Sequence, residues 1–171
     1  MKKAYLLSGE PGTGKTTIIK EVLSKVNKSA GGFYTEEIRS QGVRHGFKII
    51  TLDGKEAVLS HVSVHSPHRV SKYGIDPDNM DKVAVPALKQ AIRSKDIIVI
   101  DEIGKMELFS ASFKNAVIEA LESKNKVLGT IMLASHPWAD KIKKRPEVEV
   151  IKVTRFNRSE VIKQVLDWLA T

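Results

Sequence analysis

Gly9-Glu10-Pro11-Gly12-Thr13-Gly14-Lys15-Thr16 is the most informative stretch of this sequence, because it fits the pattern G-x-x-x-x-G-K-[ST]. In this pattern the glycines let the backbone wrap so that its N–H groups point inward at phosphate oxygens. The helix that follows adds the positive end of its dipole. The stretch therefore predicts a nucleoside-phosphate loop that contacts a nucleotide along its whole length. Glu10 and Pro11 occupy variable positions that need no special role.

Three side chains at the end of the motif are candidate ligands. Lys15 is expected to bridge the β- and γ-phosphates, and Thr16 to place its hydroxyl on Mg²⁺. Thr17 either contacts a phosphate or simply belongs to the first helical turn. A random chain of this length would match the pattern at roughly the 1% level or less. The match also lies between a predicted strand and a predicted helix, as the mechanism requires.

A second motif follows the apolar run Ile97 to Ile100, where Asp101 and Glu102 end a predicted buried strand. Asp101 is expected to hold Mg²⁺, usually through water. Glu102 is placed to accept a proton from an attacking water or to orient it, which favours hydrolysis over transfer to an organic acceptor. At least one strand-like segment lies between the two motif strands, and in P-loop NTPases such an extra strand accompanies a catalytic glutamate. The alternative is that both carboxylates merely end a strand in solvent.

The order of the predicted elements indicates a three-layer α/β fold with a mostly parallel central sheet and an antiparallel insertion after the first helix. Ala30-Gly31-Gly32 breaks the apolar pattern of the first helix, and Ser66 to Asp78 looks irregular. The expected strands are Ala4 to Ser8, Phe33 to Ile38, Gly46 to Leu52, Ala57 to Val64, Asp96 to Asp101, Lys126 to Leu133 and Val148 to Val153. The expected helices are Lys15 to Val26, Met80 to Arg93 with a kink at Pro86, Ser110 to Ser123, Pro137 to Lys144 as a short helix or turn, and Arg158 to Leu169.

Length and composition exclude several classes of protein. The 171 residues fit a single domain over the whole chain. The absence of cysteine excludes disulfides, thiolate zinc sites, cysteine nucleophiles and cysteine-ligated iron–sulfur clusters. Because no transmembrane or export segment is visible, the expected location is the cytoplasm and no membrane partner is expected.

The net charge of +8 allows two interpretations. One is a soluble, lysine-rich surface. The other is an anionic partner, which is either a nucleotide or a nucleic acid. The dense basic cluster from Lys141 to Arg145 has no interleaved aromatic residues that would make a stacking platform for bases. A nucleic-acid partner is therefore open but not favoured.

The segment from Asp101 to Phe109, Asp-Glu-Ile-Gly-Lys-Met-Glu-Leu-Phe, is more specific than a generic acidic pair. Together with Gly32 to Arg39 it resembles a family of small nucleoside-triphosphatases, also called cancer-related nucleoside-triphosphatases. The likeness continues through Tyr73 to Asp76, Leu88, Gly129 to Ile131 and Asn157-Arg158. The resemblance implies a RecA-like P-loop core, broad base tolerance, and magnesium-dependent hydrolysis of ATP, GTP and other nucleoside triphosphates to the diphosphate and phosphate.

Two positions depart from that family pattern. Arg-Val-Gly often precedes the tyrosine region, whereas this chain has Arg69-Val70-Ser71. An acidic residue often precedes the Asn-Arg pair, whereas this chain has Phe156. Neither position touches the phosphate chemistry, and both bear on the walls of the base site.

Lys105 and Glu107 follow the acidic pair closely and are further candidates for nucleotide contact. Lys105 would neutralise charge on the γ-phosphate, and Glu107 would orient Lys105 or the water. The alternative is a surface loop with an internal ion pair.

Near the C-terminus, Asn157 is expected to cap the last helix, with Glu160 reaching back in a capping box. Arg158 is then a candidate to reach the nucleotide, as an arginine supplied by the same chain can stabilise a transferring phosphate. For Arg39, an ion pair with the neighbouring glutamates is the favoured role.

The histidines and tryptophans are weak candidates. His61, His65 and His68 have metal-like spacing, but no carboxylate or cysteine completes a ligand set. Trp138 and Trp168 are expected to pack rather than to contact a cofactor.

The leading functional hypothesis is a nucleoside-triphosphatase that acts as a monomer, in which water attacks the γ-phosphorus, Glu102 polarises it, and Lys15 with Mg²⁺ takes up the developing charge. One alternative is a small-molecule or nucleotide kinase on the same scaffold, although the lid candidates here are lysine-rich rather than arginine-rich. A second is a nucleotide-switched module that binds RNA or protein, whose slow hydrolysis a polyanion would stimulate in a salt-dependent way.

Overall fold

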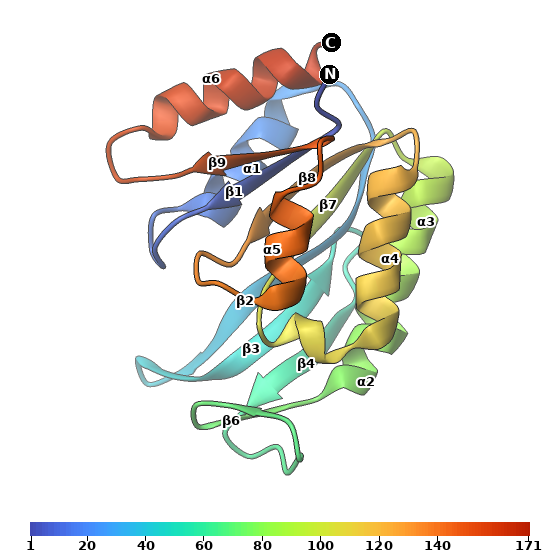
Figure 1. Cartoon of the computed structure of the whole chain (residues 1–171). Helices are drawn as coiled ribbons and strands as arrows, with labels where there is room; N and C mark the ends of the chain where they lie inside the picture. Colours follow the sequence, from blue (N-terminus) through green and yellow to red (C-terminus); the bar gives the residue numbers. More distant parts are fainter.

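The computed structural model describes residues 1–171 and contains one β-sheet with helices on both faces (Figure 1). The strands are β1 (Ala4–Ser8), β2 (Ala30–Ser40), β3 (Val43–Thr51), β4 (Glu56–His61), β5 (Arg69–Val70), β6 (Tyr73–Ile75), β7 (Ile97–Ile103), β8 (Lys126–Ile131) and β9 (Val148–Lys152). The helical segments are α1 (Lys15–Lys25), α2 (Pro77–Asn79), the π-helical η1 (Met80–Ala84), α3 (Val85–Ser94), the 3-10 helix η2 (Glu107–Phe109), α4 (Ala111–Glu122), α5 (Pro137–Lys143) and α6 (Arg158–Leu169). The strand order is β5-β6-β4-β3-β2-β7-β8-β1-β9.

The neighbouring strands β2, β7, β8, β1 and β9 run parallel and form the core of the fold. Successive side chains of a strand point to opposite faces, so Leu6 and Leu7 enter separate hydrophobic clusters. Helices α1 and α6 cover the cluster that contains Leu7, and α3 and α4 cover the cluster that contains Leu6 (Figure 1). Because both faces are buried, these strands are almost continuously apolar. This is the three-layer arrangement that the order of elements predicts.

The antiparallel half of the sheet grows from β2. This strand pairs in parallel with β7 and then antiparallel with β3, to which β4, β6 and β5 are added in turn. The β2–β3 hairpin turns through Gln41 and Gly42, whose φ values of 51° and 76° suit the right-handed twist of a two-residue hairpin. The predicted antiparallel insertion after the first helix is therefore present.

Ala30-Gly31-Gly32 lies beyond the end of α1, as predicted, but β2 begins at Ala30 and not at the predicted Phe33. These residues pair with the start of β7, and the backbones approach so closely that a Cβ at Gly32 would collide with the carbonyl oxygen of Val99. The glycines here allow a close parallel pairing rather than a turn.

Two further local predictions also need correction. The segment expected to be irregular contains the short strands β5 and β6, which pair with each other. The single helix expected over Met80–Arg93 is divided into η1 and α3, and the Val85 N–H donates to the Met80 carbonyl five residues earlier. Pro86 follows at once and has no N–H to continue the regular ladder, which accounts for an altered helix here rather than a simple kink.

The carboxyl ends of β1, β7, β8 and β9 lie at one edge of the sheet because these strands are parallel. Strand β8 lies between β1 and β7 in the sheet, although it follows both in the sequence, and the strands that come between them in the sequence lie on the far side of β7. No helix of the fold combines the length and the apolar composition needed to cross a lipid bilayer. The loops at the carboxyl edge are where this architecture positions a site.

Candidate active site

The phosphate-loop motif lies between β1 and α1, as predicted. Gly14 stands at the N-cap of α1 with a φ of 87°, a conformation that favours glycine. The Lys15 ammonium donates to the carbonyl oxygens of Gly9 (2.8 Å) and Glu10 (3.1 Å), and the Thr13 hydroxyl donates to the Glu10 carbonyl (2.9 Å). The loop therefore curls around the charged end of Lys15.

Asp101 connects this loop to β7. Its side chain is only 3% exposed, and both of its oxygens accept hydrogen bonds. The Thr16 hydroxyl donates to Oδ2 (2.5 Å) and the Thr130 hydroxyl donates to Oδ1 (2.7 Å). The structure thus brings together Thr16 and Asp101, which lie far apart in the sequence and were predicted to share a metal ion.

The surroundings of Asp101 and Glu102 change their acidity. Burial raises the pKa of Asp101, against the lowering effect of the Thr16 and Thr130 hydroxyls and of the Lys15 and Lys20 ammonium groups. Burial and the neighbouring Asp101 raise the pKa of Glu102, while Lys15 lowers it. Glu102 is consequently a stronger proton acceptor when ionised than an ordinary glutamate.

Glu107 contributes a third carboxyl to this edge of the sheet. It begins η2, is 3% exposed, and has a pKa well above the usual range because of burial and the nearby Glu102 and Asp101. Lys105 by contrast is exposed. No ion pair links the two, so the hypotheses of a Lys105–Glu107 pair and of Glu107 orienting Lys105 are not supported by the geometry.

The Glu102 side chain lies over Gly104, two residues further along the chain. A Cβ added at Gly104 would lie 2.8 Å from Cγ of Glu102 and 2.9 Å from its Oε1. The absence of a side chain at position 104 therefore leaves room for the Glu102 carboxylate in its observed position.

Comparison with known proteins agrees with this geometry. A family model described as NTPase matches residues 4–166. The chain belongs to this nucleoside-triphosphatase family. The nucleoside-triphosphatase THEP1 of Thermotoga sp. (strain RQ2) is 44% identical over 164 residues, which cover 96% of this chain and 94% of that relative. The human cancer-related nucleoside-triphosphatase is 39% identical over 183 residues, with 97% of this chain and 96% of that relative covered.

Solved structures of this nucleoside-triphosphatase family have the same fold. The crystal structure of THEP1 from the hyperthermophile Aquifex aeolicus matches with a TM-score of 0.89 and 36% identity, over 98% of this chain and 99% of that one. The solution structure of a human cancer-related nucleoside triphosphatase matches with a TM-score of 0.83 and 36% identity, over 99% and 97%. The predicted family, fold class and enzyme class are confirmed, whereas the roles of single residues stay predictions.

Several residues near the acidic edge of this nucleoside-triphosphatase were not found by sequence reasoning about chemistry. Thr130 is the next-to-last residue of β8 and donates a hydrogen bond to Asp101, and the signal for it is a polar residue near the end of a buried strand. Lys20 lies one turn beyond Thr16 on α1, and its ammonium is 4.9 Å from the centre of the Tyr34 ring. Burial and the Asp101 carboxylate raise the pKa of Tyr34 to about 12.

The structure places Arg158 beside the phosphate loop, at the start of α6. One of its guanidinium nitrogens, Nη1, lies 3.3 Å from where a Cβ at Gly14 would be, and another, Nη2, lies 3.8 Å from Oε2 of Glu21. The predicted capping box is wrong. Asn157 holds the N-cap position but accepts from the Thr154 N–H (2.8 Å), so its side chain fixes the preceding loop instead of the helix.

The remaining candidates have structural roles. Arg39 forms the expected ion pair with Glu37 (2.6 Å), and the Trp168 ring stacks on Tyr5 with centroids 4.1 Å apart. Trp138 packs against the larger hydrophobic cluster. No group of three or more His, Cys, Asp or Glu side chains is arranged to hold a metal ion.

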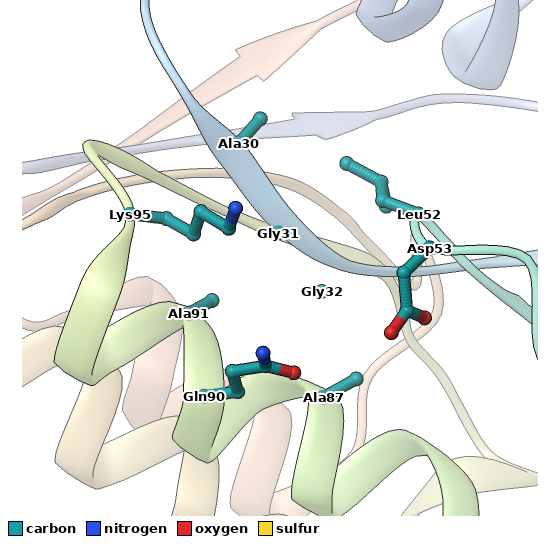
Figure 2. A pocket seen from close by; sticks show the side chains of 9 residues that line it. All are labelled: Ala30, Gly31, Gly32, Leu52, Asp53, Ala87, Gln90, Ala91 and Lys95. Atoms are coloured by element: carbon teal, nitrogen blue, oxygen red, sulfur yellow. The ribbon is translucent and has the colours of Figure 1, made fainter.

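A small cavity of about 150 Å³ lies between the start of β2 and the α3 helix (Figure 2). Gly31, Gly32 and Ala91 form part of its wall, and the polar side chains of Asp53, Gln90 and Lys95 surround it. It contains none of the predicted site residues. The cavity is therefore separate from the phosphate loop and its acidic partners.

Proposed function

We propose that this chain hydrolyses nucleoside triphosphates, ATP and GTP among them, to the diphosphate and phosphate with Mg²⁺ as cofactor. The observation that carries the proposal is the hydrogen bond of 2.5 Å between Thr16 and Asp101. It brings the end of the phosphate loop and the acidic end of β7 together, and Lys15 and Glu102 are the sequence neighbours of the two bonded residues. The names of the relatives support the same general reaction.

The residues at this contact fit a magnesium ion. A hydroxyl and a carboxylate are hard oxygen donors, and Mg²⁺ is typically held by one or two carboxylates together with substrate phosphates rather than by a full protein cage. Thr16 and Asp101 would hold the ion, and Thr130 would orient the Asp101 carboxylate through their hydrogen bond. When bound, the ion neutralises negative charge on the phosphate oxygens.

The phosphate loop supplies fixed positive charge. Lys15 is the first residue of α1, and its ammonium binds carbonyls of the loop in which the β- and γ-phosphates are expected to bind. As the bond from the γ-phosphorus to the leaving oxygen breaks, negative charge grows on that oxygen. Lys15 stabilises it without any reorganisation of the loop.

Glu102 acts on the water. Its Oε atoms accept a proton as the water oxygen bonds to the γ-phosphorus, and the diphosphate leaves from the opposite side. Partial burial and the nearby Asp101 raise the pKa of Glu102, which makes its carboxylate a better base. The cytoplasmic location, the monomeric state and the independence from nucleic acid stay predictions.

Release of inorganic phosphate from ATP and from GTP, with no other acceptor present, tests this function. With Mg²⁺ we expect release from both nucleotides, and with excess EDTA we expect release to fall to the background rate, because the Thr16–Asp101 site then lacks its cation. Tight nucleotide binding without phosphate release would contradict hydrolysis. That result would favour a kinase or a nucleotide-switched module.

Gly104→Ala tests whether the position of the Glu102 carboxylate matters. The new methyl group needs the space that the Glu102 side chain occupies, so we expect kcat to fall roughly 10- to 100-fold with little change in KM. The measurement is steady-state phosphate release, with thermal unfolding to check the fold. The matched control is the same substitution in a Glu102→Gln background, where it should have little further effect. Equal losses in both backgrounds would show that the methyl group acts elsewhere.

A further inference from the structure

The strand order gives the direction in which a bound nucleotide lies, if the proposed function is correct. Asp101 and Glu102 lie near the carboxyl end of β7, which is on one side of β1, whereas β9 is on the other side. Hydrolysis requires the γ-phosphate to face Glu102. The nucleoside at the opposite end of the triphosphate must then extend toward β9 and the loop of residues 154–157 that follows it.

This loop is joined to the phosphate loop at both of its ends. At the start, the Val153 N–H donates to the Ser8 carbonyl (2.7 Å), and Gly9 lies so close that a Cβ there would collide with the Val153 carbonyl oxygen. At the end, Arg158 lies beside Gly14. The two loops are next to each other at the same edge of the sheet (Figure 1).

Hydrogen bonds also hold the loop in one shape. The Thr154 N–H donates to Oδ1 of Asn157 (2.8 Å), and Nδ2 of Asn157 donates to the Lys152 carbonyl (2.8 Å). The Phe156 N–H donates to the Thr154 hydroxyl (3.2 Å). The backbone that carries Phe156 is therefore fixed relative to the phosphate loop.

The Phe156 side chain does not pack against the protein. It is 96% exposed, and it is the only Phe, Tyr or Trp among the exposed large hydrophobic residues. An aromatic ring that is rigidly mounted beside a phosphate loop and left uncovered offers a π-face to a planar ligand. Stacking of a nucleobase on an aromatic ring contributes about 1–3 kcal/mol and works with any base.

We propose that the ring of Phe156 is the platform on which the base of the bound nucleoside triphosphate stacks. Arg158, two residues after Phe156 in the sequence, lies beside Gly14 of the phosphate loop. Because stacking uses the face of the base and not its hydrogen-bonding edge, the platform binds both purines and pyrimidines. Purines gain more affinity because their stacking face is larger.

Phe156→Ala tests the platform by equilibrium titration with Mg²⁺ complexes of non-hydrolysable analogues of ATP, GTP and CTP. Loss of stacking should raise all three dissociation constants, by about 5- to 100-fold for the purine nucleotides and by less for CTP. Inorganic tripolyphosphate, which has no base, should bind the variant and the wild type equally. Phe156→Trp should restore affinity, and its fluorescence should be quenched on binding. Val43→Ala, which shortens another exposed apolar side chain, is the matched control.

Two results would overturn the proposal, and they have different consequences for the proposed function. If Phe156→Ala leaves the three nucleotide constants unchanged while both proteins bind them and tripolyphosphate, the platform is wrong and the proposed function stands. If the wild type binds neither the nucleotides nor tripolyphosphate, the proposed function fails and the platform fails with it. Thermal unfolding should not differ between the variant and the wild type, because the side chain has almost no contacts to lose.

Discussion

Replacing Glu102 with Gln is expected to lower kcat for ATP and GTP hydrolysis by roughly 10²- to 10⁴-fold, which is the usual contribution of a general base. The amide has nearly the shape of the carboxylate and fits over Gly104, but it cannot accept the proton of the attacking water. Because Glu102 is adjacent to Asp101 and its pKa is raised, the substitution also removes a carboxyl that is costly to bury. Nucleotide affinity should therefore be kept or improved.

The measurement for Glu102→Gln is phosphate release in single turnover, beside the dissociation constant of the Mg²⁺ nucleotide complex. Glu119→Gln is the matched control, because Glu119 is half-exposed on α4 and pairs with Lys89. It should retain wild-type turnover. Full turnover in Glu102→Gln with intact binding would exclude Glu102 as the base.

Lys15→Ala is expected to reduce kcat/KM by roughly 10²-fold or more, with losses in both affinity and turnover. The ammonium is the positive side chain at the centre of the phosphate loop, where it also binds the Gly9 and Glu10 carbonyls. Its removal takes away charge in the bound state and in the transition state. It also removes two hydrogen bonds that shape the loop.

Steady-state kinetics with ATP and with GTP measure this loss. Lys25→Ala, at the exposed end of the same helix, deletes the same charge away from the loop and should be close to wild type. A Lys15→Ala variant that keeps normal kcat/KM would show that the phosphate loop does not take part in catalysis.

Much of the fold could be predicted because its elements have strong local signals. The apolar strands β1, β7, β8 and β9 and the amphipathic helices α1, α4 and α6 lie within a few residues of their predicted ranges. The predictions are wrong where a tertiary contact overrides the local signal that a residue gives in the sequence. Gly31 and Gly32 end the helical pattern as predicted, but they also belong to β2, where their lack of a side chain leaves room for neighbouring backbone and helix atoms. Strands as short as β5 and β6 have no periodicity to detect.

The site was predictable where a motif fixes both the residue types and their spacing. Lys15, Thr16, Asp101 and Glu102 come from motifs with fixed spacing, and the structure brings them to one edge. The contact of Thr130 with Asp101, by contrast, depends on the strand order, which places β8 beside β7 in the sheet. Asn157 is at the N-cap position, but its side chain accepts a hydrogen bond from the backbone N–H of Thr154 and not from the helix. Local sequence does not show such competition between partners.

The position of β1 between β8 and β9 also determines when the site can form during synthesis. Ala4 pairs with Val127 and with Val148, so β1 is synthesised more than a hundred residues before either of its partner strands. The hairpin of β2 and β3 closes locally and can form early, whereas pairing across most of the chain carries a larger loop-closure entropy. A nascent chain that ends before β8 therefore exposes an apolar β1 with no neighbour. The edge that brings Thr16 and Asp101 together therefore cannot be completed before β8 and β9 have been synthesised.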